Sequence, residues 1–159
     1  MLPLWAQIFA EPKEGFAVHI ARVFLRLSVA TLLGGIVGIE RHREGKYAGL
    51  RTHMLVALGA ALFTLIPQEA KMTTADLSRV IQGVAAGIGF LGAGTILKLE
   101  EQHRIEGLTS AASVWVTAAI GMSIGAGWLW PAIVGVIWGW IILWLIHRLE
   151  QHLRKQQTP

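Results

Sequence analysis

The sequence predicts an all-α fold, a polytopic bundle of about five transmembrane helices that forms a single domain. Three observations carry this prediction: five apolar stretches of helical length, a low content of charged residues, and the position of those charges between the stretches. Charged residues make up 15% of the 159 residues, hydrophobic residues make up 53%, and the mean hydropathy is +0.53. Soluble domains carry about 25% charged residues. Since one membrane-spanning helix needs about 20 apolar residues, a chain of this length accommodates five or six of them with short loops.

The apolar stretches cover residues 19–39, 50–66, 80–97, 108–125 and 128–146. The second is short for a membrane span and is expected to end before Pro67, because proline cannot continue a helix. Gly125 and Gly127 separate the fourth stretch from the fifth, and Pro131 falls in a first turn, where its missing N–H costs little. The sequence thus divides into an interfacial segment that is expected to be retained (1–18), a transmembrane domain (19–147) and a short basic tail (148–159).

The distribution of basic residues predicts the orientation of the bundle, because cytoplasmic loops carry an excess of Lys and Arg. The termini and loops at one membrane face carry nine basic residues, and those at the other face carry five. The nine are Arg41, Arg43, Lys46, Arg51, Lys98, Arg104, Arg148, Arg154 and Lys155, and the five are Lys13, Arg22, Arg26, Lys71 and Arg79. We therefore expect the N-terminus outside and the C-terminus in the cytoplasm, which an odd number of spans also requires.

Glycines dominate the third stretch. Small residues let helices approach closely in a membrane, where lipid removes the hydrophobic drive for helix association. Gly83, Gly87 and Gly94 share one helical face, while Gly89 and Gly92 point away from it, and this predicts a central helix that neighbours contact on several sides. The alternative is a helix that unwinds at residues 89–92 and offers carbonyl groups to an ion. The match to G-x-G-x-x-G is rejected as a dinucleotide site, because no strand precedes it.

The fifth stretch has two different faces. Gly135 and Gly139 lie on one side and are expected to pack on the bundle. Trp140 and Trp144 lie on roughly the opposite side and are expected to meet lipid or a second subunit.

Hydroxyl side chains recur at helical spacing in the fourth stretch. Thr109, Ser113 and Thr117 lie on one face, and Ser110 is close by in the first turn. Such residues usually form hydrogen bonds within their own helix or to a neighbour, and the alternative is that they line a narrow polar path. In the second stretch a similar narrow face consists of His53, Ala57, Ala60 and Thr64. His53 is expected to be a capping or interfacial residue rather than a metal ligand.

Ionisable residues near the membrane are the next candidates for function. Arg26 lies about 10 Å into the first helix at 1.5 Å per residue, and Asp76 is its expected partner at the outer surface. The alternative is that Arg22 and Arg26 both extend to that surface. At the inner end, Glu40 is expected to pair with Arg51.

The ten carboxylates all lie at the ends of the stretches, in loops or in tails. Divalent cations are usually held through carboxylates, so this placement argues against a self-contained divalent-cation channel. No cysteine is present, which excludes a disulfide framework, a thiolate metal site and a cysteine nucleophile. We expect no enzymatic activity, no cofactor and no nucleic-acid partner, because no arrangement of nucleophile, base and oxyanion hole is enforced and no broad basic face is present.

Four blocks of the sequence resemble the membrane domain of the MgtC/SapB family. They are Glu40-Arg41, the A-G-L-R-T-H block at 48–53, the G-I-G-F-L-G-A-G block at 87–94 and the G-L-T-S-A-A block at 107–112, and the resemblance covers residues 26–127. Two features depart from the family pattern. Glu106 stands where many members carry a basic residue, and the chain is expected to lack the soluble C-terminal domain of the virulence-type members.

The resemblance implies a bacterial inner-membrane protein tied to growth at low magnesium and to survival inside host phagocytes. It implies a non-enzymatic modulator of membrane partners, the proton-translocating ATP synthase among them, in a homo-oligomer. The alternative is a transporter of Mg²⁺ or of another small ion or solute. The functional positions that the family pattern implies are Arg26, Glu40, Arg51, Thr52, His53, Asp76, the 87–94 run and residues 107–112. On this hypothesis Arg26 and Asp76 fix the first helix against the third, and Glu40, Arg51 and His53 form a cytoplasmic face that a partner reads.

Overall fold

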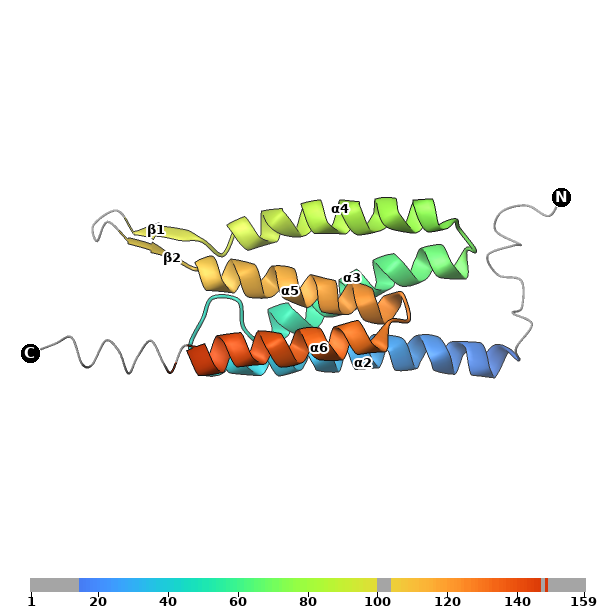
Figure 1. Ribbon diagram of the computed structural model, residues 1–159, viewed down its shortest axis with the longest axis horizontal. Helices are drawn as coiled ribbons and strands as arrows, with labels where there is room; N and C mark the ends of the chain where they lie inside the picture. Colours follow the sequence, from blue (N-terminus) through green and yellow to red (C-terminus); the bar gives the residue numbers. More distant parts are fainter. Residues whose placement is uncertain (1–14, 100–103, 147, 149–159) are drawn as a thin grey trace, which may run out of the picture.

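The computed structural model describes residues 15–99, 104–146 and 148. The chain forms α2 (Phe16–Arg43), α3 (Leu50–Glu69), α4 (Thr74–Ala93), β1 (Leu97–Leu99), β2 (Arg104–Glu106), α5 (Leu108–Gly125), α6 (Leu129–Trp140) and the π-helical turn η2 (Ile141–Ile146), which continues α6. The prediction of five helices in an all-α bundle is confirmed (Figure 1). Three of them, α2, α3 and α5, are long and apolar enough to cross a membrane, and α6 with its continuation forms a shorter apolar helix.

Several helix boundaries differ from the expected ones, and two of these differences follow from the local sequence. Helix α3 continues through Pro67 to Glu69, because the proline falls in the last turn, where little helix remains to be broken. Helix α4 begins at Thr74, six residues before the apolar stretch, because Thr73 and Asp76 form a capping box. The predicted interfacial segment lies outside the described residues as far as 14, and α2 already begins at Phe16. The tail is described only at Arg148.

A short antiparallel hairpin between α4 and α5 was not predicted. Strands β1 and β2 pair Leu97 with Glu106 and Leu99 with Arg104. Gly107 follows with φ of 92°, a left-handed conformation that side chains disfavour. Three-residue strands are too short to show an alternating pattern, so the sequence carried no signal for them.

Figure 1 shows the arrangement of the helices. Helices α3 and α5 lie in the middle, α2 and α6 cover one side, and α4 runs along the opposite edge. The hairpin and the end of η2 lie at one end of the bundle, called here the hairpin end, and α2 begins at the other, called the N-terminal end.

The tightest helix contacts involve glycines of α2 and α5 against α3. A Cβ atom at Gly34 would lie 2.6 Å from the Cβ of Ala57, and one at Gly38 would lie 2.8 Å from the Cα of Leu50. On the other side of α3, a Cβ at Gly121 would lie 2.8 Å from the Cα of Ala57. These separations leave no room for a side chain, so α3 is held between α2 and α5 at backbone contact.

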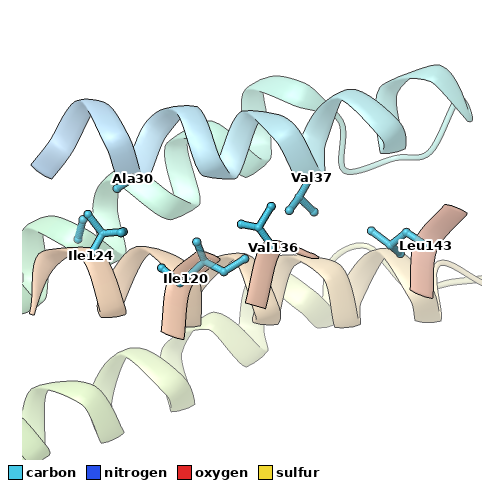
Figure 2. Close-up of a cluster of buried hydrophobic side chains, with 8 residues drawn as sticks. Ala30, Val37, Ile120, Ile124, Val136 and Leu143 are labelled. Atoms are coloured by element: carbon cyan, nitrogen blue, oxygen red, sulfur yellow. The ribbon is translucent and has the colours of Figure 1, made fainter. Parts of the chain in front are cut away.

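The apolar core lies between α2, α5 and α6. Figure 2 shows Ala30 and Val37 of α2 facing Ile120 and Ile124 of α5 and Val136 of α6. Leu143 in η2 extends this cluster. The predicted packing of the glycine face of the fifth stretch is confirmed: a Cβ at Gly135 would lie 3.3 Å from Ile120, and one at Gly139 would lie 3.9 Å from Val116, both on α5. Trp140 and Trp144 stack on each other on the outside, with ring centroids 5.1 Å apart.

The prediction that α4 is a central helix is wrong. A Cβ at Gly83, Gly87 or Gly89 would meet nothing within 4 Å, and Gly92 alone among the α4 glycines approaches a neighbouring helix, at 3.6 Å from the carbonyl oxygen of Ala111. Gly94 caps the helix. The alternative of an unwound segment also fails, because residues 74–93 are continuously helical.

Candidate functional site

A buried polar layer lies between α2, α3 and α5 toward the hairpin end. Its members are polar or charged residues of very low exposure: Glu40, Arg41, His53, Ser110, Ser113 and Thr117. Within the described part of the chain, every buried side-chain nitrogen and oxygen atom has a hydrogen-bond partner. Polar groups that are this deeply buried must be satisfied, because an unpaired one costs about 1–3 kcal/mol.

His53 lies at the centre of this layer and is fully buried. Its Nδ1 lies 2.9 Å from the carbonyl oxygen of Gly49 and its Nε2 lies 3.1 Å from the Ser113 hydroxyl. A carbonyl oxygen can only accept, so Nδ1 donates to Gly49. His53 therefore joins α3 to α5 inside the bundle, and it does not cap α3, whose N-terminus has no side-chain cap. Its expected position near the membrane interface stays a prediction.

The other members of the hydroxyl face bond to their own helix. The Ser113 hydroxyl, which has one proton to donate, lies 2.8 Å from the carbonyl oxygen of Ser110 and 3.1 Å from His53 Nε2. Thr117 donates to the carbonyl oxygen of Ser113 at 2.8 Å. On α3, Thr64 lies 3.1 Å from the carbonyl oxygen of Met122 and so bonds α3 to α5. Thr109 is exposed and lies outside the buried layer. Of the two readings of the hydroxyl face, hydrogen bonding within the helix and to a neighbour is the one observed.

Glu40 pairs with Arg41 and not with Arg51. The Arg41 guanidinium donates from Nε at 2.5 Å and from its terminal nitrogen at 2.7 Å to the two carboxylate oxygens. Arg41 is 2% exposed and Glu40 is 7% exposed, so this ion pair lies inside the bundle. Breaking a buried pair by removing one partner leaves an uncompensated charge and costs about 3–5 kcal/mol. The sequence analysis named Glu40-Arg41 as a family-like block but did not identify Arg41 as the partner of Glu40.

The cytoplasmic face expected to contact a partner is only partly exposed. Glu40 and His53 are enclosed, whereas Arg51 and Thr52 are exposed in the first turn of α3. With His42 and Gly49 they line a recess of about 440 Å³ at the hairpin end. A partner that approaches this end can thus contact Arg51 and Thr52 directly, whereas Glu40 and His53 are shielded by the surrounding helices.

Arg26 does not contact Asp76. Its guanidinium donates to Gln68 Oε1 at 3.0 Å and to the carbonyl oxygen of Gly125 at 3.3 Å, and the Gln68 amide donates to Ala126 at 2.7 Å. Arg26 therefore ties α2 to the end of α3 and to the turn that leads into α6. Sequence reasoning missed Gln68, because a single glutamine after Pro67 looked like part of a loop.

Asp76 belongs to the cap of α4, ahead of the apolar stretch. Its carboxylate accepts from the Thr73 hydroxyl at 2.7 Å, from the Thr73 backbone N–H at 3.2 Å and from Arg79 at 3.1 Å. The bonds from Thr73, followed by the charge of Arg79, lower the pKa of Asp76 below its ordinary value. Asp76 thus acts within its own helix and not as the anchor of α2.

Within residues 15–99, 104–146 and 148, no group of three or more His, Cys, Asp or Glu side chains is arranged to hold a metal ion. Ser113, at 4% exposure, is enclosed with its hydroxyl directed into the bundle. Through the contact between His53 and Ser113, this layer joins α3 to α5.

Comparison with known proteins decides the family. The model of the MgtC family matches residues 27–152. The chain belongs to the MgtC family. This match confirms the resemblance found in the sequence, and the MgtC family is not a known family of enzymes.

Curated relatives come from several bacteria. The chain is 44% identical over 138 residues to protein SrpB of Synechococcus elongatus, which covers 79% of this chain and 75% of SrpB. It is 40% identical over 140 residues to the putative magnesium transporter YhiD of Escherichia coli, covering 84% of this chain and 64% of YhiD. It is 41% identical over 132 residues to protein MgtC of Brucella abortus, covering 82% of this chain and 53% of that protein. The chain thus spans about half to three quarters of these relatives, and no solved structure matches it.

Proposed function

We propose that this MgtC-family chain is a non-enzymatic modulator of other membrane proteins in the bacterial inner membrane, acting in adaptation to low magnesium or host stress. The closed polar layer carries the proposal. Ser113 and Thr117 are buried, and their hydroxyl groups have hydrogen-bond partners inside the bundle: His53 for Ser113 and the carbonyl oxygen of Ser113 for Thr117. A side chain that lines a conduction path needs polar groups free to replace the water around a moving ion.

The orientation predicted from the basic residues belongs to this proposal. It puts the hairpin end in the cytoplasm, where Arg51 and Thr52 are exposed beside the recess at the start of α3. A partner with a cytoplasmic acidic surface fits this end, because Arg51 offers a guanidinium that is suited to carboxylates. The ATP synthase is the candidate partner that the family resemblance implies.

The test is co-reconstitution of the purified protein with ATP synthase in vesicles and measurement of ATP-driven proton pumping. We expect the protein to change the pumping rate, and we expect the Arg51→Ala/Thr52→Ala variant to lose this effect. Arg79→Ala is the matched control, since Arg79 is an exposed arginine at the opposite end of the bundle. An equal effect of both variants would show that the hairpin end is not the surface that the partner recognises. No effect of the unchanged protein would remove ATP synthase as the partner.

The second candidate function is transport of Mg²⁺, because the Escherichia coli relative is described as a putative magnesium transporter. Flux into vesicles that contain this protein alone distinguishes the two functions. We expect Mg²⁺ uptake equal to that of empty vesicles, beside a working magnesium channel as positive control. Uptake above that of empty vesicles that is lost in Ser113→Ala would overturn the modulator proposal and make the hydroxyl face a path.

A further inference from the structure

Three neighbouring hollows follow one another along α3, beginning at the hairpin end. The recess of about 440 Å³ beside Arg51 and a second hollow of about 350 Å³ share Thr52 as a lining residue. The second hollow and a groove of about 560 Å³ between α3 and α4 share Leu91. Helices α3 and α4 lie side by side in Figure 1, and together the three hollows form one trough between them, called here the α3–α4 trough.

The length of the trough corresponds to one leaflet of a bilayer. Its lining residues on α3 recur at spacings of four, three and four residues, on one side of the helix: Thr52, Val56, Gly59 and Phe63. From the first to the last of these the helix rises about 16.5 Å at 1.5 Å per residue. Half of the hydrocarbon core of a bilayer is about 15 Å thick. Since α3 is long and apolar enough to cross a membrane, the trough matches the depth of a single layer of acyl chains.

The two ends of the trough differ in chemistry. The groove between α3 and α4 is lined by apolar side chains and glycines, among them Leu55, Phe63 and Leu91. The recess at the hairpin end is lined by the charged Arg51 and by His42 and Thr52, with Gly49 and Leu50. A polar recess that leads into an apolar groove of leaflet depth fits a molecule with a charged headgroup and a hydrocarbon chain.

Arg51 determines which headgroup charge fits the recess. Its side chain is exposed and forms no hydrogen bond or ion pair within the described part of the chain, whereas the buried Arg41 is bonded to Glu40. A guanidinium group binds phosphate through two parallel hydrogen bonds. None of the described residues that line the recess is acidic, so the ammonium group of a zwitterionic headgroup finds no carboxylate there. Charge complementarity therefore favours a headgroup with a net negative charge.

We propose that the α3–α4 trough binds one anionic phospholipid, with its phosphate on Arg51 and an acyl chain in the groove between α3 and α4. Thr52 lies where the recess meets the second hollow, and its hydroxyl group can donate to a phosphate oxygen. Basic pockets beside membrane helices are a recognised type of site for anionic headgroups. The lipid site does not depend on the modulator role proposed above, because it requires only this chain and the bilayer.

Native mass spectrometry of the delipidated protein in detergent tests the headgroup. The protein is titrated with phosphatidylglycerol or with phosphatidylcholine that carries the same acyl chains, so only the headgroup differs. We expect the first phosphatidylglycerol to bind about fivefold more tightly, which is the contribution of one basic side chain near an anionic surface. Arg51→Ala should remove this preference, and Arg79→Ala, at an exposed arginine of the opposite end, should keep it. Equal affinity for the two lipids, or a preference that survives Arg51→Ala, would overturn the proposal.

A pair of glycine variants tests the apolar part of the site. Gly87 lines the groove and a Cβ there would meet nothing within 4 Å, so Gly87→Leu should leave helix content and melting unchanged while it fills part of the groove. Affinity for both lipids should fall about fifteenfold, the effect of two CH₂ groups leaving the groove. Gly89→Leu is the matched control, because Gly89 also meets open space on α4 but does not line the groove. Unchanged affinity in Gly87→Leu, or equal losses in both variants, would contradict the site.

Inorganic phosphate distinguishes a lipid site from a site for a soluble anion. Added at the concentration of the lipid, it should leave the bound phosphatidylglycerol in place, because it lacks the acyl chain that fills the groove. Displacement of the lipid by inorganic phosphate at equal concentration would show that the recess binds a free anion and would overturn the lipid proposal.

Discussion

The Nε2 atom of His53 on α3 and the hydroxyl oxygen of Ser113 on α5 lie 3.1 Å apart, sixty residues apart in the chain. This contact joins the two helices inside the bundle, toward the hairpin end. Both residues are almost completely buried. The carbonyl oxygen of Gly49 accepts from His53 Nδ1, and the carbonyl oxygen of Ser110 lies 2.8 Å from the Ser113 hydroxyl. The pair is thus part of the framework of the bundle, at a position where sequence alone placed an interfacial histidine.

Replacing His53 should destabilise the bundle. His53→Ala removes the bonds to Gly49 and Ser113 and leaves a cavity, so we expect a loss of about 1–3 kcal/mol in the free energy of unfolding. Thermal or denaturant unfolding in detergent measures it. Arg51→Ala is the control in the same turn, because Arg51 is exposed and should change stability little. Equal losses in the two variants would contradict the structural role of His53.

The glycines of α5 and α4 should respond in opposite ways to the same substitution. Gly121→Ala would drive its Cβ into the backbone of Ala57, and we expect a loss of about 1–3 kcal/mol or failure to fold. Gly87→Ala meets open space and replaces a poor helix former, so monomer stability should stay unchanged or rise by up to about 1 kcal/mol. Unfolding in dilute detergent measures both. If Gly87→Ala lowered the free energy of unfolding more than Gly121→Ala does, Gly87 would have to pack against a neighbouring helix, as the sequence analysis predicted for a central α4.

Much of the fold could be predicted from the sequence. Apolar length located all five helices, and the helical repeat placed His53, Ala57, Ala60 and Thr64 on one face, which is buried. The position of α4 could not be predicted in this way. In a membrane, apolar residues face both lipid and protein, so hydropathy does not distinguish the inner from the outer side of a helix. A row of glycines on a helix likewise does not show whether a neighbouring helix packs against it.

The ion pairs of the candidate site were the least predictable part. Opposite charges near the same membrane surface suggested Arg26 with Asp76 and Glu40 with Arg51. In the structure, both carboxylates bond to residues that are close in sequence instead. Asp76 accepts hydrogen bonds from Thr73 in the first turn of α4. Glu40 bonds to the adjacent Arg41. Pairing across a bundle requires the helix arrangement to be known first, and local hydrogen bonds compete with it.

Arg26 and Asp76 should act independently of each other. Arg26→Ala removes the donors to Gln68 and to the carbonyl oxygen of Gly125, and we expect a loss of about 1–3 kcal/mol. Asp76→Ala should cost about 1 kcal/mol through the helix cap. Unfolding of the double variant should show additive losses, because the two side chains share no partner. A coupling energy above about 0.5 kcal/mol would indicate the direct pair that the sequence suggested.

The carboxyl group of Asp76 offers a prediction on pH. Its pKa is lowered chiefly by the bonds from Thr73 and less by the charge of Arg79. Because the folded pKa is depressed, the capping interaction stabilises α4 at pH above the ordinary value of 3.8 and is lost as the pH falls through the lower folded value. Asp76 is the single aspartate of the chain, so aspartate-selective ¹³C labelling gives one carboxyl signal to titrate. Thr73→Ala should raise this pKa more than Arg79→Ala does, and the reverse order would show that the arginine charge, not the capping box, holds the carboxylate.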